Sequence, residues 1–285
     1  MSDLIAVIPR VAGLFGVGGL VLWGVRRRPD IAVLTARLRT WLLIAVVWFA
    51  ALALGRAGVV VLATGCGVIA ATECARLTII GHHSRRVVIA AGGSLPLATM
   101  LGGTRWLVVL AVVLLACTIP PLVTQDLQNG FSDLAASCMT VLWIGATCSA
   151  LAVLPLPLLP LLGVATATAD IGGFVGGATL GRHPLAARLS PHKTWEGLLG
   201  AAVLATVGAA ITADVAGLAL WSAPLLGGAV AVASTWGDLL ESLVKRTAGC
   251  KDAGSWLPGF GGLLDRVDSL LVTAPLAWAV LVLSS

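Results

Sequence analysis

Long stretches without a charged residue divide this chain into about ten apolar segments. With 58% hydrophobic residues, 11% charged residues and a mean hydropathy of +1.01, the composition is typical of integral membrane proteins. Because a helix needs about 20 apolar residues to cross a bilayer, we expect an all-α, polytopic membrane protein with about nine to ten transmembrane helices. The expected spans are 4–25, 41–55, 57–75, 87–103, 106–124, 137–154, 156–176, 197–213, 219–240 and 267–284.

A single transmembrane domain covering residues 1–285 is the simplest organisation, since no shift in composition marks a soluble part. Residues 1–155 are mostly apolar helices with basic loops, and we interpret them as a scaffold. Residues 156–285 hold eight of the thirteen acidic residues. We expect the catalytic helices and loops there.

The net charge of +5 comes from basic residues that are concentrated in alternate loops between the expected spans. The positive-inside rule explains this pattern without a nucleic-acid partner, and it predicts that these loops face the cytoplasm. We therefore expect a multi-pass protein of the inner, cytoplasmic membrane whose polar motifs face the cytoplasm. These alternate loops contain Arg26, Arg27, Arg28, Arg37 and Arg39, then Arg76, Arg85 and Arg86, then Arg182, Arg188 and Lys193, and finally Lys245, Arg246, Lys251 and Arg266.

The stretch 234–268 holds nine charged residues, five of them acidic, in a chain with only 11% charged residues. Two of the three lysines in the protein lie there, and the third lies in the motif SPHKTWEG at 190–197. Charges in so apolar a chain are costly unless they are paired, hydrated or bound to a metal. The concentration predicts a site for an anionic ligand that carries a metal ion.

The spacing of the acidic residues favours phosphoryl or nucleotidyl transfer. Asp238, Glu241 and Lys245 share one face of a helix, and Asp265 and Asp268 share a face of another, with a glycine-rich loop between the two helices. Carboxylate oxygens suit Mg²⁺, lysine and arginine suit phosphate, and glycines can present bare N–H groups to phosphate. Taken alone, each carboxylate could instead cap a helix or pair with a cation.

Asp170 is an acidic residue inside an apolar segment, which makes it a functional candidate. The glycines that follow it at four-residue spacing permit close helix packing, or alternatively close approach of the backbone to a ligand. Acidic residues of this kind also occur in cation-coupled transporters, which is the alternative outside enzymes. The clustering of charges at one end of the helices argues against a transporter.

The stretch from Ser242 to Asp268 resembles the signature of the phosphatidate cytidylyltransferases, or CDP-diacylglycerol synthases. It has the pattern S-x-x-K-R-x4-K-D-x5-P-G-x-G-G-x-x-D-R-x-D. The resemblance continues upstream through Gly237-Asp238-x-x-Glu241-Ser242, the motif at 190–197, Gly181-Arg182-His183, and Asp170 with its glycines. A weaker similarity is found at Glu73. One position departs from the pattern, because Phe260 replaces the histidine of the family.

The resemblance implies transfer of CMP from CTP to a phosphatidate-type lipid, which gives CDP-diacylglycerol and pyrophosphate. It implies Mg²⁺, with a second cation left open, and a homodimer. The metal ligands are expected to be Asp265 in the leading role, with Asp252, Asp268 and Asp238. The expected catalytic residues are Lys245, Arg246, Lys251, Asp252, Asp265 and Arg266. The expected substrate-binding residues are Asp170, Arg182, Ser190, His192, Lys193, Thr194, Ser242, Gly261 and Gly262.

Three other functions stay open at this point. The chain could be a related CTP-dependent lipid kinase, a cytidylyltransferase for another lipid phosphate, or an inactive paralogue. The last is raised by Phe260, because its ring cannot titrate or donate to phosphate as histidine does.

Overall fold

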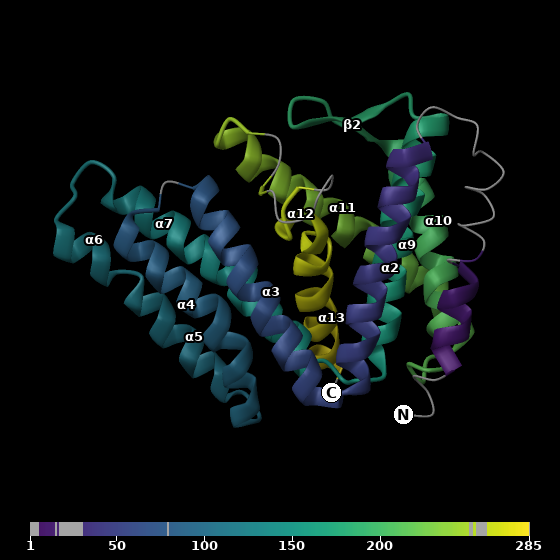
Figure 1. Cartoon of the computed structure of the whole chain (residues 1–285), viewed down its shortest axis with the longest axis horizontal. Helices are drawn as coiled ribbons and strands as arrows, with labels where there is room; N and C mark the ends of the chain where they lie inside the picture. The colour runs from purple at the N-terminus through teal and green to yellow at the C-terminus, as the bar shows by residue number, and fades with distance from the viewer. Residues whose placement is uncertain are drawn as a thin grey trace.

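The computed structural model describes residues 6–14, 16, 31–78, 80–250, 253–254 and 261–284, and these are almost entirely helical. Figure 1 shows the helices arranged side by side, with several running from one end of the molecule to the other. The helices are α2 (Ile31–Ala53), α3 (Gly55–Leu77), α4 (His82–Ala98), α5 (Arg105–Ala116), α6 (Ile119–Thr124), α7 (Gly130–Thr140), α8 (Thr147–Val153), α9 (Leu158–Leu180), α10 (Trp195–Thr212), α11 (Ala223–Thr247), α12 (Leu264–Val267) and α13 (Leu270–Ser284).

The all-helical, polytopic membrane class is confirmed. In the described part of the chain, six helical segments are long and apolar enough to cross a bilayer, and two shorter apolar helices accompany them. The helix α4 was also expected to span, but it has 17 residues and begins with five polar side chains. The expected span 4–25 lies largely outside the described residues. The six segments are Gly55–Leu77, Arg105–Thr124, Gly130–Val153, Leu158–Leu180, Trp195–Thr212 and Leu220–Thr247, and the shorter ones are Leu38–Ala53 and Leu270–Leu283.

The helices α9 and α10 pack through glycines, so closely that their backbones touch. A Cβ atom added at Gly200 would lie 2.5 Å from the carbonyl oxygen of Gly172, and one added at Gly176 would lie 2.8 Å from that of Glu196. No side chain fits at these distances, which is the usual reason for small residues at a transmembrane helix interface. Of the two interpretations of the glycines after Asp170, helix packing is therefore the one with direct support at Gly172 and Gly176.

A short hairpin between α9 and α10 departs from the purely helical expectation. Strand β1 (Pro184–Ala186) pairs antiparallel with β2 (Ser190–Thr194). The second strand leads directly into α10, where the Thr194 hydroxyl accepts the Gly197 N–H at 3.1 Å as an N-cap. The motif at 190–197 thus forms a strand and the start of a helix.

The hairpin, the end of α11 and the helix α12 lie at the same end of the molecule, at the top of Figure 1. The turn between α10 and α11 and the end of α13 lie at the opposite end. Because α9, α10 and α11 follow one another with short connections, they alternate in direction. The two polar motifs are therefore brought to one end although about 40 residues separate them in the sequence.

Candidate active site

Three carboxylates meet where α11 passes the start of α13. Asp238 and Glu241 lie on α11 and Asp268 follows α12, and one oxygen atom of each lies within 4.8 Å of the others. Glu241 and Asp268 are buried, and Asp238 is partly exposed. We call these three residues the carboxylate cluster. Its two positions on α11 are three residues apart, which puts both on one face of the helix.

The carboxylate cluster has the chemistry of a divalent-cation site. The Glu241 Oε1 atom is buried and has no hydrogen-bond partner among the described residues. Burial raises the pKa of the Asp268 carboxyl well above its usual range, and the carboxylates of Asp238, Glu241 and Asp170 raise it further. An unpartnered buried oxygen and mutual repulsion are both relieved by a cation, and an all-oxygen donor set suits Mg²⁺.

Lys245 joins the carboxylate cluster to α12. Its ammonium group donates to Glu241 Oε2 at 2.7 Å and to Asp265 Oδ1 at 2.6 Å, and only 12% of its side chain is exposed. The second oxygen of Asp265 accepts the backbone N–H groups of Ala253 at 3.1 Å and Gly262 at 2.7 Å. Both oxygens of Asp265 thus contact donors of the protein, and Asp265 lies beside the carboxylate cluster.

Lys193 connects the hairpin to the same place. From β2 its ammonium forms an ion pair with Asp238 Oδ2, and both side chains are about one third exposed. A second contact runs from the Arg246 side chain to the carbonyl oxygen of Leu189, at 3.4 Å. The hairpin segment therefore contacts α11 at two places, Asp238 and Arg246.

Asp170 reaches the site from α9. Its Oδ1 atom accepts hydrogen bonds from the hydroxyls of Ser234 at 2.9 Å and Ser269 at 3.1 Å, which lie on α11 and at the start of α13. Asp170 thus ties three helices together next to the carboxylate cluster. This arrangement explains why an acidic residue is tolerated inside an apolar segment.

Comparison with known proteins identifies the family. The sequence profile of the cytidylyltransferase family matches residues 35–284. The chain belongs to the cytidylyltransferase family. A phosphatidate cytidylyltransferase of Mycobacterium leprae (strain TN) is 39% identical over 162 residues, which cover 55% of this chain and 52% of the relative. One of Brucella suis biovar 1 (strain 1330) is 46% identical over 110 residues, covering 38% and 41%. The chain spans about half the length of the curated relatives it matches, or less.

In this cytidylyltransferase-family chain, the remaining predicted site residues surround the same end of the helices. Arg182 and His192 are exposed on the hairpin segment, Ser190, Thr194 and Arg266 are half-buried, and Ser242 is buried on α11. Gly261 has a φ of +80°, which favours glycine, and Gly262 is buried against Asp265. The predicted residues Lys251 and Asp252, and the departure at Phe260, lie outside the described residues.

Two contributions to the site were not predicted. Glu241 was placed on the face of Asp238 by its spacing but was not included among the metal ligands. The spacing of three residues from Asp238, on the same helix face, was the signal that could have added it. The hydroxyls of Ser234 and Ser269 carried no such signal, because serine is common at helix interfaces and only the fold brings these two to Asp170.

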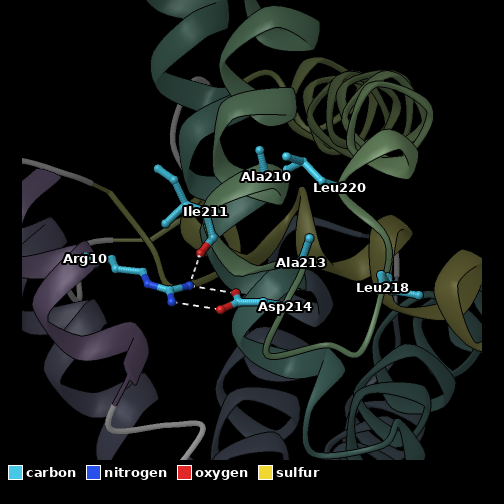
Figure 2. Close-up of a pocket in the computed structure, with 7 residues that line it drawn as sticks. All are labelled: Arg10, Ala210, Ile211, Ala213, Asp214, Leu218 and Leu220. Atoms are coloured by element: carbon cyan, nitrogen blue, oxygen red, sulfur yellow. Dashed lines mark hydrogen bonds and ion pairs between the residues drawn. The ribbon is translucent and has the colours of Figure 1, made fainter.

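A separate hollow of about 490 Å³ lies at the other end of α10 and is shown in Figure 2. There Arg10 donates to both oxygens of Asp214, at 2.6 and 2.8 Å, and to the carbonyl oxygen of Ile211 at 2.7 Å. The 18 residues of α10 put this hollow roughly 27 Å from the hairpin, at 1.5 Å per residue. It contributes nothing to the carboxylate cluster, and its ion pair holds the helical segment 6–14 against the end of α10.

Proposed function

We propose that this chain transfers CMP from CTP to a phosphatidate-type lipid phosphate, giving CDP-diacylglycerol and pyrophosphate in a Mg²⁺-dependent reaction. The observation that carries the proposal is the carboxylate cluster with the Lys193 and Lys245 ammonium groups beside it, at one end of a membrane protein of the cytidylyltransferase family. Cations and metal-type carboxylates in one place suit a reaction between two phosphate groups.

Asp238, Glu241 and Asp268 are the residues that would hold Mg²⁺, on the evidence of the unpartnered Glu241 oxygen and the all-carboxylate donor set. The ion would supply positive charge to the phosphate oxygens of CTP. Asp265 was expected to be the leading ligand, and we now propose a different role for it. Its contacts to Lys245 and to two backbone N–H groups make it the residue that holds Ala253 and Gly262 beside the cluster.

The chemical step needs little from the protein beyond position and charge. A lipid phosphate oxygen attacks the α-phosphorus of CTP, a new phosphorus–oxygen bond forms, and the bond to the bridging oxygen breaks as pyrophosphate leaves. The attacking oxygen is already anionic, so no general base is required. Among the described cations, Lys193 is well placed to neutralise a phosphate at the cluster, with Arg246 and Arg266 nearby. The expected roles of Lys251 and Asp252 stay predictions.

The other expected substrate-binding residues are retained as part of the proposal. Arg182, Ser190, His192 and Thr194 lie on or beside the hairpin. Gly261 and Gly262 lie shortly before the start of α12. Ser242 lies on α11 between Glu241 and Lys245. A second cation and a homodimer stay expectations that only the resemblance supports.

The test of the function is product analysis. The purified chain in detergent should convert radiolabelled CTP and phosphatidate into a CDP-lipid with release of pyrophosphate, and chelation of Mg²⁺ should stop the reaction. A phosphorylated lipid with CDP as the second product would instead identify a lipid kinase. If CDP-lipid formed only from another lipid phosphate, the reaction class would stand but the lipid substrate would be a different one. No product from any lipid phosphate would overturn the proposal.

We further predict that the site faces the cytoplasm of an inner-membrane protein. Ala187 and Ala219 are exposed beyond the two ends of α10, so a single cysteine at each position reports one side of the membrane. In intact cells, on a background without the six native cysteines, a membrane-impermeant thiol reagent should label Ala219→Cys. It should label Ala187→Cys only after the membrane is opened. Labelling of Ala187→Cys in intact cells would contradict the orientation.

A further inference from the structure

Glu73 is a buried carboxylate of the N-terminal half that contacts the loop beside the candidate active site. It lies near the end of α3 and is 1% exposed, next to the apolar core residues Ala71 and Cys74. Its two oxygens accept consecutive backbone N–H groups at the start of α12, from Leu263 at 3.1 Å and Leu264 at 2.7 Å. About 190 residues of sequence separate the partners. A charged acceptor makes each of these hydrogen bonds stronger than a neutral one.

Two glycines before α12, Gly254 and Gly262, lie so close to the Glu73 carboxylate that a larger side chain at either position would collide with it. A Cβ atom added at Gly254 would lie 2.6 Å from Glu73 Oε1, and one added at Gly262 would lie 2.6 Å from Oε2. Neither glycine has the positive φ that would demand glycine for conformational reasons. The fit against the carboxylate is therefore the reason that a side chain is excluded at these two positions. We call the segment between α11 and α12 the glycine loop, and its described residues 253–254 and 261–263 its two stems. One stem contains Gly254 and the other contains Gly262, and both glycines lie against Glu73.

Glu73 and Asp265 divide the backbone donors of these stems between them. Asp265 accepts the N–H groups of Ala253 and Gly262, and Glu73 accepts the next two along the chain. The helix α12 then makes one turn, and its Leu264 carbonyl accepts the N–H of Asp268 at 3.0 Å. The position at which α12 begins therefore sets the position of Asp268 against α11.

We propose that Glu73 is a positioning residue of the active site, which holds both stems of the glycine loop and the start of α12 so that Asp265 and Asp268 lie against α11. This assigns a role in the site to the half of the chain that was interpreted as scaffold. The consequence for turnover rests on the proposed function, whereas the consequence for the loop does not. A purely structural acid would stabilise the fold without affecting metal binding, so the two roles are separable by experiment.

Three variants test the proposal. Glu73→Gln keeps the size of the side chain but removes the charge and turns one acceptor into a donor. Gly254→Ala leaves Glu73 unchanged and pushes it away from the loop. Gly65→Ala is the matched control, because it lies on the same helix as Glu73 and an added Cβ would meet nothing within 4 Å.

The first measurement is hydrogen–deuterium exchange of the purified protein without substrate. Loss of hydrogen bonds to a charged acceptor is expected to speed exchange in peptides covering 261–270 by about tenfold or more in Glu73→Gln and Gly254→Ala. Peptides from α9 and α10 should exchange as in the wild type. Gly65→Ala should be unchanged throughout.

The second measurement is the Mg²⁺ concentration that gives half-maximal transfer. It should rise by about fivefold or more in Glu73→Gln and Gly254→Ala, because Asp268 is displaced from the carboxylate cluster. Unchanged exchange in 261–270 in both variants would overturn the proposal. Faster exchange with an unchanged Mg²⁺ requirement would also overturn it, since Glu73 would then be structural only. If the wild type transfers nothing, the proposed function fails, while the exchange experiment still decides whether Glu73 holds residues 261–270 in place.

Discussion

Replacing Asp268 with asparagine is expected to reduce CTP-dependent transfer by about 10²- to 10³-fold, since charge neutralisation by a bound metal contributes several kcal/mol to the transition state. The same change should leave the thermal midpoint equal or higher without Mg²⁺, because it removes one of three mutually repelling carboxylates. The Asp268 Oδ1 atom accepts the Ser269 N–H at 2.8 Å, and an asparagine oxygen can keep that bond. Lower activity with unimpaired stability is the signature of a metal ligand.

The control for this experiment is Asp214→Asn, at the other end of α10. Asp214 is exposed and pairs with Arg10, so its loss should leave transfer unchanged. A second measurement uses Mg²⁺ itself, which should raise the thermal midpoint of the wild type and of Asp214→Asn but not that of Asp268→Asn. Normal transfer by a folded Asp268→Asn protein would refute the assignment of the carboxylate cluster.

Replacing Lys245 with methionine is expected to destabilise the protein by about 3–5 kcal/mol, the usual cost of removing one partner from a buried ionic group. The ammonium lies between Glu241 and Asp265, whose side chains are 2% and 7% exposed. Without it, two buried carboxylates are left without their cation. The measurement is the free energy of unfolding, or the thermal midpoint, in the same detergent.

Two further variants separate this role from phosphate binding. Arg246→Met changes the neighbouring cation, which is exposed and donates to the backbone carbonyl oxygens of Leu189 and Cys250, so it should alter thermal stability little. Adding Glu241→Gln to Lys245→Met should recover part of the lost stability, because one of the two uncompensated charges is removed. If Lys245→Met were as stable as the wild type and lost only turnover, Lys245 would act on phosphate, as the sequence first suggested.

The local properties of this chain could be predicted from its sequence. The apolar segments predict a polytopic helical protein because each must satisfy its backbone hydrogen bonds within a bilayer, and this depends on segment length and composition alone. The motif from Ser242 to Asp268 predicts the family because it has many defined positions in a single stretch. The spacing of Asp238 and Glu241 predicts that they share a face, since helical periodicity is local.

The tertiary structure decided which of these groups meet. Asp265 and Asp268 are both acidic and three residues apart, and no local sequence pattern tells their roles apart. In the fold, Asp265 accepts hydrogen bonds from Lys245 and two backbone N–H groups, whereas Asp268 joins the carboxylate cluster. Likewise, nothing near Glu73 in the sequence points to Leu263 and Leu264, about 190 residues away. The physical reason is that a carboxylate's role depends on the donors and charges within a few ångströms, and in this fold those come from distant helices.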